Sequence, residues 1–199
     1  MVRWLVIAAH PDPASFSAWM RDAAIASLQD AGAHVDLIDL YAIDFEPSMS
    51  DEEHRRYEEI SADHPDPLVR DHIDLIARAD AMLFVFPTWW GSMPAVMKGW
   101  LDRVLLPGVG FQLNERSGKV EPGLRHIKYL AGLTTYGGSQ WVQRLVGDGG
   151  RTIITRTLWL MTSKRHRGTW LALDRIDLRK DEERAAFVER ACAELRALT

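Results

Sequence analysis

Hydrophobic residues along the chain gather in short runs, and longer stretches of helical periodicity separate these runs. The runs at residues 3–9 and 81–86 are apolar on both faces, which is typical of strands buried inside a parallel sheet, and residues 127–133 are predicted to be a further strand. An alternating segment at 34–40 and an apolar run at 170–176 are also predicted to be strands. The pattern therefore predicts five strands.

Apolar residues spaced three and four apart predict helices over residues 16–31, 67–78, 94–105 and 149–163, and from Asp181 to the end of the chain. Ser15 is the expected N-cap of the first helix, and Gly32 is its expected stop. Residues 41–66 are interpreted as a polar loop with a short helix. Residues 107–124 are interpreted as a loop because they are rich in Gly and Pro.

Alternating strands and helices indicate an α/β fold with a doubly wound parallel sheet and helices on both faces. Five strands suit the order 2-1-3-4-5, and 199 residues suit a single domain over residues 1–199. In this topology ligands bind beyond the carboxyl ends of the strands, where the strand order reverses. The loops after the first, third and fourth strands should meet there.

Each of these three loops has features of a ligand site and also an ordinary structural interpretation. The loop from His10 to Ser17 enters a helix N-terminus, which attracts anions, although it could simply cap the helix. The adjacent Trp89 and Trp90 cannot both enter the core, so one should line a cleft or a dimer contact. The loop at 134–139 contains Gly137-Gly138, where a backbone can approach a ligand closely. Phosphate donors, aromatic walls and backbone donors together are what a flavin nucleotide requires.

Composition narrows the class of protein. The 24 basic and 28 acidic residues give a net charge of -4, which does not favour nucleic-acid binding. A single cysteine, Cys192, excludes an internal disulfide and a cysteine-based metal site, and it favours a reducing, cytoplasmic compartment. No apolar run approaches the roughly 20 residues that cross a bilayer. We therefore expect a soluble protein with a small-molecule ligand, no metal and no membrane span.

Three segments resemble the NAD(P)H:quinone oxidoreductase family, often called DT-diaphorases. They are AHPDPASFS from Ala9, FPTWWGSMPAVMKGWLDRV from Phe86, and LTTYGGS from Leu133. The resemblance implies a flavodoxin-like fold and a homodimer with each flavin site at the interface. It also implies ping-pong transfer of a hydride from NAD(P)H through the flavin to a quinone or similar small acceptor. The first loop favours FAD, and FMN stays an alternative.

The resemblance also implies roles for individual residues. It assigns the flavin phosphates to His10, Ser15, Phe16 and Ser17, the ring to Pro87, Thr88, Trp89 and Trp90, and the polar ring edge to Thr134, Thr135, Gly137 and Gly138. Phe111 would reach over the flavin of the partner subunit. The flavin carries the chemistry, and no His follows the Gly-Gly loop as it does in vertebrate members. Tyr136 and Trp141 are the candidates for a catalytic contact.

Two other functions stay open. The same fold could serve as an electron carrier, or as a flavin-bound regulatory subunit associated with a membrane transporter. A zinc-dependent deacetylase is suggested by His10-Pro11-Asp12, because related enzymes place a similar motif after the first strand. Here Pro13 stands where the second Asp would be, and no His-x-x-His pair follows.

Overall fold

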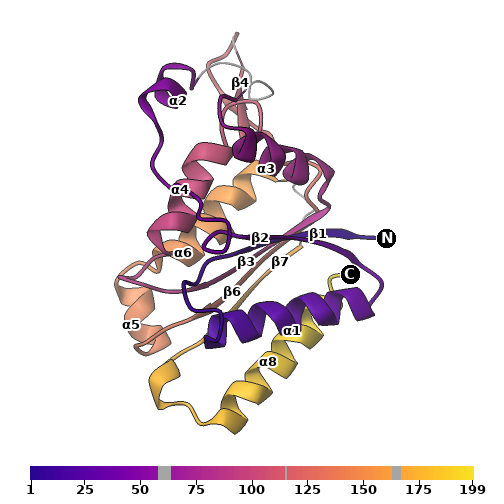
Figure 1. Ribbon diagram of the computed structural model, residues 1–199, viewed down its shortest axis with the longest axis vertical. Coiled ribbons are helices and arrows are strands. Elements are labelled where there is room, and N and C mark those ends of the chain that lie inside the picture. Colours follow the sequence, from indigo (N-terminus) through magenta and orange to yellow (C-terminus); the bar gives the residue numbers. More distant parts are fainter. Residues whose placement is uncertain (58–63, 115, 163–166) are drawn as a thin grey trace.

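The computed structural model describes residues 1–57, 64–114, 116–162 and 167–199. Its centre is a five-stranded sheet in the order β2-β1-β3-β6-β7, in which every neighbouring pair is parallel (Figure 1). This confirms the predicted topology. The strands are β1 (Arg3–Ala8), β2 (His34–Asp39), β3 (Ala81–Pro87), β6 (Tyr129–Thr135) and β7 (Arg167–Leu173).

Helices cover both faces of the sheet (Figure 1). One face carries α1 (Phe16–Asp30) and α8 (Asp181–Arg196), and the other carries α3 (Pro67–Arg78), α4 (Ala95–Val104) and the segment 149–161. Successive strand residues point to opposite faces, so Trp4 and Val6 belong to one apolar cluster while Leu5 and Ile7 belong to the other. The sheet is therefore buried on both sides.

The first helix begins and ends as its sequence predicts. Ser15 is the N-cap, and its Oγ accepts a hydrogen bond from the amide of Ala18 at 3.1 Å. Gly32 has a left-handed φ of 84° and follows the helix, and its amide donates to the carbonyl of Gln29. This start fixes the direction in which the first loop presents its amides.

Two predicted strands are shifted along the chain. The strand predicted at 127–133 is β6 at 129–135, because Thr134 and Thr135 are buried and continue the pairing with β3. The strand predicted at 170–176 is β7 at 167–173. It stops there because Arg175 adopts a left-handed φ of 51° and leads into the short 3-10 helix η3 (Ile176–Leu178).

The loop predicted at 107–124 contains a two-stranded antiparallel hairpin, β4 (Phe111–Leu113) and β5 (Val120–Pro122). The short helix predicted within 41–66 is α2 (Asp51–Arg55), while residues 58–63 of that segment lie outside the described residues. The helix predicted at 149–163 consists of α6 (Gly149–Thr152), a π-helical turn (Ile153–Leu158) and α7 (Trp159–Met161), and residue 163 is also outside the description. One further helix, α5 (Gln140–Leu145), was not predicted.

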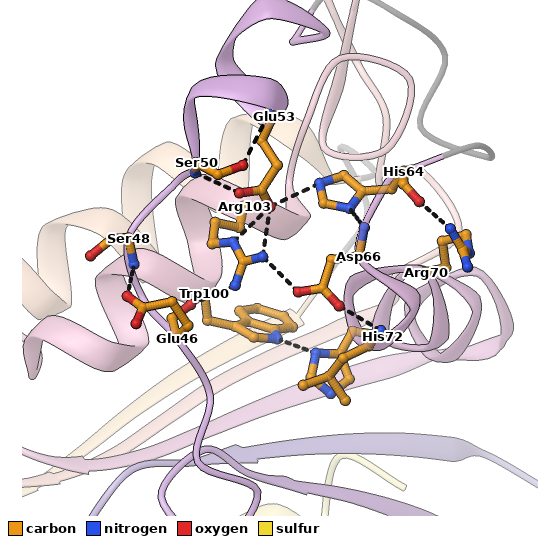
Figure 2. A network of polar contacts seen from close by, with 11 residues as sticks. Glu46, Ser48, Ser50, Glu53, His64, Asp66, Arg70, His72, Trp100 and Arg103 are labelled. Atoms are coloured by element: carbon orange, nitrogen blue, oxygen red, sulfur yellow. Dashed lines mark hydrogen bonds and ion pairs between the residues drawn. The ribbon is translucent and has the colours of Figure 1, made fainter.

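A buried polar network joins α2 and the start of α3 to α4 (Figure 2). Arg103 on α4 is 4% exposed, and its guanidinium donates to Glu53 Oε1 at 2.8 Å and to Asp66 Oδ2 at 2.7 Å. Although burial raises the pKa of Glu53, hydrogen bonds from Ser50 and Arg103 outweigh this effect and lower it. His64 lies 3.2 Å from the same carboxylate. The network holds the segment that precedes α3 against α4.

Candidate active site

The three predicted loops lie together at the carboxyl ends of β1, β3 and β6. The amide of Thr88 donates to the carbonyl of Thr135 at 2.9 Å, which joins the second loop to the third. The ring of His10 lies 6.1 Å from the ring of Trp89, which joins the first loop to the second. Residues from three distant parts of the chain thus form one surface at the switch point of the sheet.

The first loop presents donors toward solvent. His10 Nδ1 lies 3.0 Å from the amide of Asp12 and 3.1 Å from its carbonyl oxygen, so Nε2 is the ring nitrogen left for a ligand. The amides of Phe16 and Ser17 lie in the first turn of α1, where no intrahelical carbonyl precedes them. The side chain of Ser17 is buried, so its amide is better placed than its hydroxyl to meet an anion. The arrangement fits a phosphate group.

The second loop exposes both of its tryptophans. Trp89 is 41% exposed and Trp90 is fully exposed, so neither side chain enters the core. Trp89 and Ser92 exchange two backbone hydrogen bonds across a tight turn, and Trp90 within it has a positive φ of 49°. Such a backbone costs of order 1–3 kcal/mol in a residue other than glycine, and it is characteristic of functional loops. The turn therefore exposes the two indole rings to solvent, and the ring of Trp89 lies beside the first loop.

The third loop divides into a buried half and an open half. Thr134 Oγ1 donates to the carbonyl of Phe86 at 2.7 Å, so this side chain ties β6 to β3 rather than facing a ligand. Thr135 and Pro87 are buried as well. A Cβ added at Gly138 would meet nothing within 4 Å, and one at Gly137 would meet only Asp177 Oδ2 at 4.0 Å. The backbone of these two glycines is open to close approach.

Tyr136 does not face this surface. It is fully buried, and its hydroxyl donates to Asp148 Oδ2 at 2.7 Å and accepts the indole N–H of Trp170 at 2.8 Å. Burial, followed by the hydrogen bond to Asp148, raises the pKa of Tyr136, so it remains protonated. The suggestion that Tyr136 makes a catalytic contact does not fit this position. Its hydrogen bonds in the core fix the residue that directly precedes Gly137 and Gly138.

Helix α5 is a part of the site that sequence reasoning missed. None of its residues is buried, and Trp141 and Leu145 are 70% and 71% exposed. The helix flanks the tryptophan loop, because a Cβ added at Gly91 would lie 3.9 Å from Gln143 Oε1 on the helix and 3.4 Å from Cγ2 of Val146, its C-cap. The signal that could have revealed it is the N-cap Ser139, whose Oγ accepts the amide of Val142. The catalytic contact suggested for Trp141 stays a prediction, and its exposed side chain is free to meet a ligand.

Phe111, predicted to reach a partner subunit, lies on strand β4 and is half-buried. It lines an apolar groove together with Leu101, Leu105, Val120 and Met161. The groove lies between α4, the hairpin and the helical segment 153–161, and the three loops contribute no residue to it. Phe111 is therefore not part of the surface formed by its own subunit's loops.

Residues 1–57, 64–114, 116–162 and 167–199 hold neither a cluster of metal-binding side chains nor a membrane-spanning helix. No group of three or more His, Cys, Asp or Glu side chains in those ranges is placed to hold a metal ion. No helix within them is both long enough and apolar enough to cross a membrane.

Comparison with known proteins places the chain in a family. A family model described as a flavodoxin-like fold matches residues 2–195. Human ribosyldihydronicotinamide dehydrogenase [quinone] is 30% identical over 163 residues, which cover 73% of this chain and 68% of the human protein. The chain belongs to the NAD(P)H:quinone oxidoreductase family. The relatives behind this assignment are named as NAD(P)H or ribosyldihydronicotinamide dehydrogenases, which places the chain among oxidoreductases.

Solved structures agree with the assignment to the quinone oxidoreductase family. The NAD(P)H:quinone oxidoreductase from Methanothermobacter marburgensis is 26% identical with a TM-score of 0.83, and the match covers 100% of this chain and 99% of that one. An FMN-dependent NADH-azoreductase from Bacillus anthracis, in complex with FMN, is 16% identical with a TM-score of 0.74 over 99% and 98% of the two chains, and shares the fold. Among the curated relatives the matched part spans between 48% and 68% of their length.

Proposed function

We propose that this protein is a flavin-dependent oxidoreductase that passes a hydride from NAD(P)H to a quinone or a similar small acceptor. The observation that carries the proposal is the meeting of three features at the switch point of the sheet. These are the amides at the start of α1, the exposed pair Trp89 and Trp90, and the open backbone of Gly137 and Gly138. Each matches a different part of a flavin nucleotide.

A bound flavin would supply the hydride chemistry itself. The chain's residues would hold and tune it. His10 Nε2 and the amides of Phe16 and Ser17 would donate to the phosphates. The rings of Trp89 and Trp90 would flank the flavin ring and exclude water from one side. Amides of the glycine loop would face the polar edge of the ring, where fixed donors favour the negative charge that reduction brings.

We infer that FAD is preferred over FMN, because the first loop has donors at both of its ends, which suits a diphosphate better than a single phosphate. His10 stands at its start, and the first turn of α1 stands at its end. Donor and acceptor would use the same open face of the flavin in turn, since Trp89 and Trp90 line the other. This order of events is ping-pong.

Flavin binding is tested by titrating flavin-free protein with FAD and, separately, with FMN while following quenching of flavin fluorescence. We expect saturable binding with one flavin per chain and a lower dissociation constant for FAD. Tighter binding of FMN would overturn the FAD preference alone. Absence of saturable binding by both flavins would overturn the proposed function.

We further propose that a second copy of the chain covers the groove beside Phe111. The groove is mostly apolar, and Val120 at its edge is 54% exposed. Leu113, which pairs with Val120 across the hairpin, is 53% exposed. An apolar patch of this kind on a soluble protein marks an interaction site. If the flavin site lies at a dimer interface, as the family resemblance implies, a second copy on this groove would bring Phe111 next to the flavin site of the partner subunit.

Val120→Glu is expected to convert the dimer to a monomer, because it places a charge in the apolar groove. Sedimentation velocity measures the change. Leu178→Glu is the matched control, since Leu178 is 78% exposed and lies outside the groove. A Val120→Glu protein that sediments as the wild type does would show that this groove is not the interface.

A further inference from the structure

A second groove lies next to the candidate active site, along one face of the helical segment that follows Asp148. The end nearest α5 is lined by Arg144, Arg151 and Arg156. Arg151 and Thr155 also line the adjoining hollow, which continues to Trp159 and Trp170. One continuous surface therefore carries arginines at one end and tryptophans at the other.

The guanidinium groups of these three arginines distinguish the groove. Within the described residues, none of their guanidinium groups makes a hydrogen bond or an ion pair. Several other arginines are paired, as Arg103 is with Glu53 and Arg179 is with Asp174. Three unpaired guanidinium groups around one hollow attract an anion strongly, because each can donate two parallel hydrogen bonds to a phosphate.

The balance of charge in the groove is positive. Asp148 is the carboxylate among the lining residues of the arginine end. It is only 4% exposed, and its Oδ2 is taken by the hydroxyl of Tyr136. Its single negative charge does not offset three arginines, so this end of the groove would hold a phosphate rather than a cation.

The groove is joined to the loops of the candidate active site. The amide of Gly149 donates to the carbonyl of Gly91 in the tryptophan loop at 2.7 Å. Tyr136, which precedes the glycine loop, is held by Asp148 at 2.7 Å. The groove therefore borders the active-site loops, and a ligand that extends past the loops on this side would enter it.

We propose that the groove binds the adenosine end of the nicotinamide donor and selects NADPH over NADH. The 2′-phosphate, which NADH lacks, would lie on Arg144, Arg151 and Arg156. The adenine ring would lie against Trp159 and Trp170, since aromatic faces bury flat rings well. The inference rests on the proposed function, because it assigns the donor of that same reaction.

The test uses adenosine 2′,5′-bisphosphate, a fragment that carries the 2′-phosphate but has no nicotinamide. Calorimetric titration of the flavin-loaded protein is expected to show at least about tenfold tighter binding of this fragment than of 5′-AMP. Arg151→Gln and Arg156→Gln should each reduce this preference from about tenfold to about threefold or less. Arg125→Gln, at an exposed arginine outside the groove, is the control and should leave it unchanged.

The same variants are then assayed for turnover with NADPH and NADH. We expect Arg151→Gln to raise the KM for NADPH about tenfold and to leave the KM for NADH unchanged. Equal binding of the two fragments, or a fragment preference that survives both groove substitutions, would overturn the inference. Fragment binding does not require hydride transfer, so a protein that binds the bisphosphate selectively but reduces nothing would overturn the proposed function instead.

Discussion

Arg103→Met is expected to lower the free energy of unfolding by about 3–5 kcal/mol, the cost of breaking a buried ion pair. The substitution leaves Glu53, which is 6% exposed, buried without the cation that balances it (Figure 2). Asp66 loses its contact at 2.7 Å as well. Urea unfolding followed by tryptophan fluorescence measures the loss, because Trp100 lies in the same region, where its indole donates to His72.

Arg125→Met is the matched control for this prediction. Arg125 pairs with Glu121 at 3.6 Å, and the two side chains are 64% and 41% exposed. Such surface pairs contribute roughly 0–1 kcal/mol. Adding Glu53→Gln to Arg103→Met should recover part of the stability, because an amide costs less to bury than a carboxylate. A loss at Arg103 no larger than the loss at Arg125 would show that the network does not hold α2 and α3 in place.

Ser15→Asp is expected to weaken flavin binding at least tenfold. Two unit charges 4 Å apart repel by about 4 kcal/mol at an effective dielectric constant of 20, so a carboxylate beside the flavin phosphates should act strongly. Asp is as good an N-cap as Ser, so α1 should still begin at Phe16. The dissociation constant from flavin fluorescence measures the effect.

Ser15→Asn is the matched control, because it changes the N-cap residue as Ser15→Asp does but adds no charge. Asn also caps helices well and adds no charge, so its dissociation constant should stay within about threefold of the wild-type value. Both variants should melt at similar temperatures. If the Asp and Asn variants bind flavin equally well, the start of α1 does not hold the phosphates.

The sheet order and the meeting of the three loops could be predicted because they depend on local pattern. A strand buried on both faces is apolar, as β3 is throughout and β1 is from Trp4 onward, and parallel strands bring their following loops to one edge. The start of α1 could be predicted as well, since Ser15 and its acceptor role lie within one turn.

What could not be predicted depends on partners far away in the chain. The hairpin strands β4 and β5 have three residues each, too few to show a period. Tyr136 precedes two exposed glycines and has the sequence context of a ligand contact, but Asp148 and Trp170 hold its hydroxyl in the core. The ion pair of Glu53 and Arg103 joins residues fifty positions apart. Sequence pattern gives no sign of such pairs.

The most direct test of hydride transfer is an anaerobic absorption spectrum of the flavin-loaded protein, recorded before and after NADPH or NADH is added. If the protein is a flavin-dependent NAD(P)H oxidoreductase, the visible absorption band of the oxidised flavin bleaches when the nicotinamide is added, because the hydride reduces the flavin. It then returns when a quinone is supplied. A flavin band that persists at saturating NADPH and NADH would contradict the proposed function and would leave the protein as a flavin carrier or a regulatory subunit.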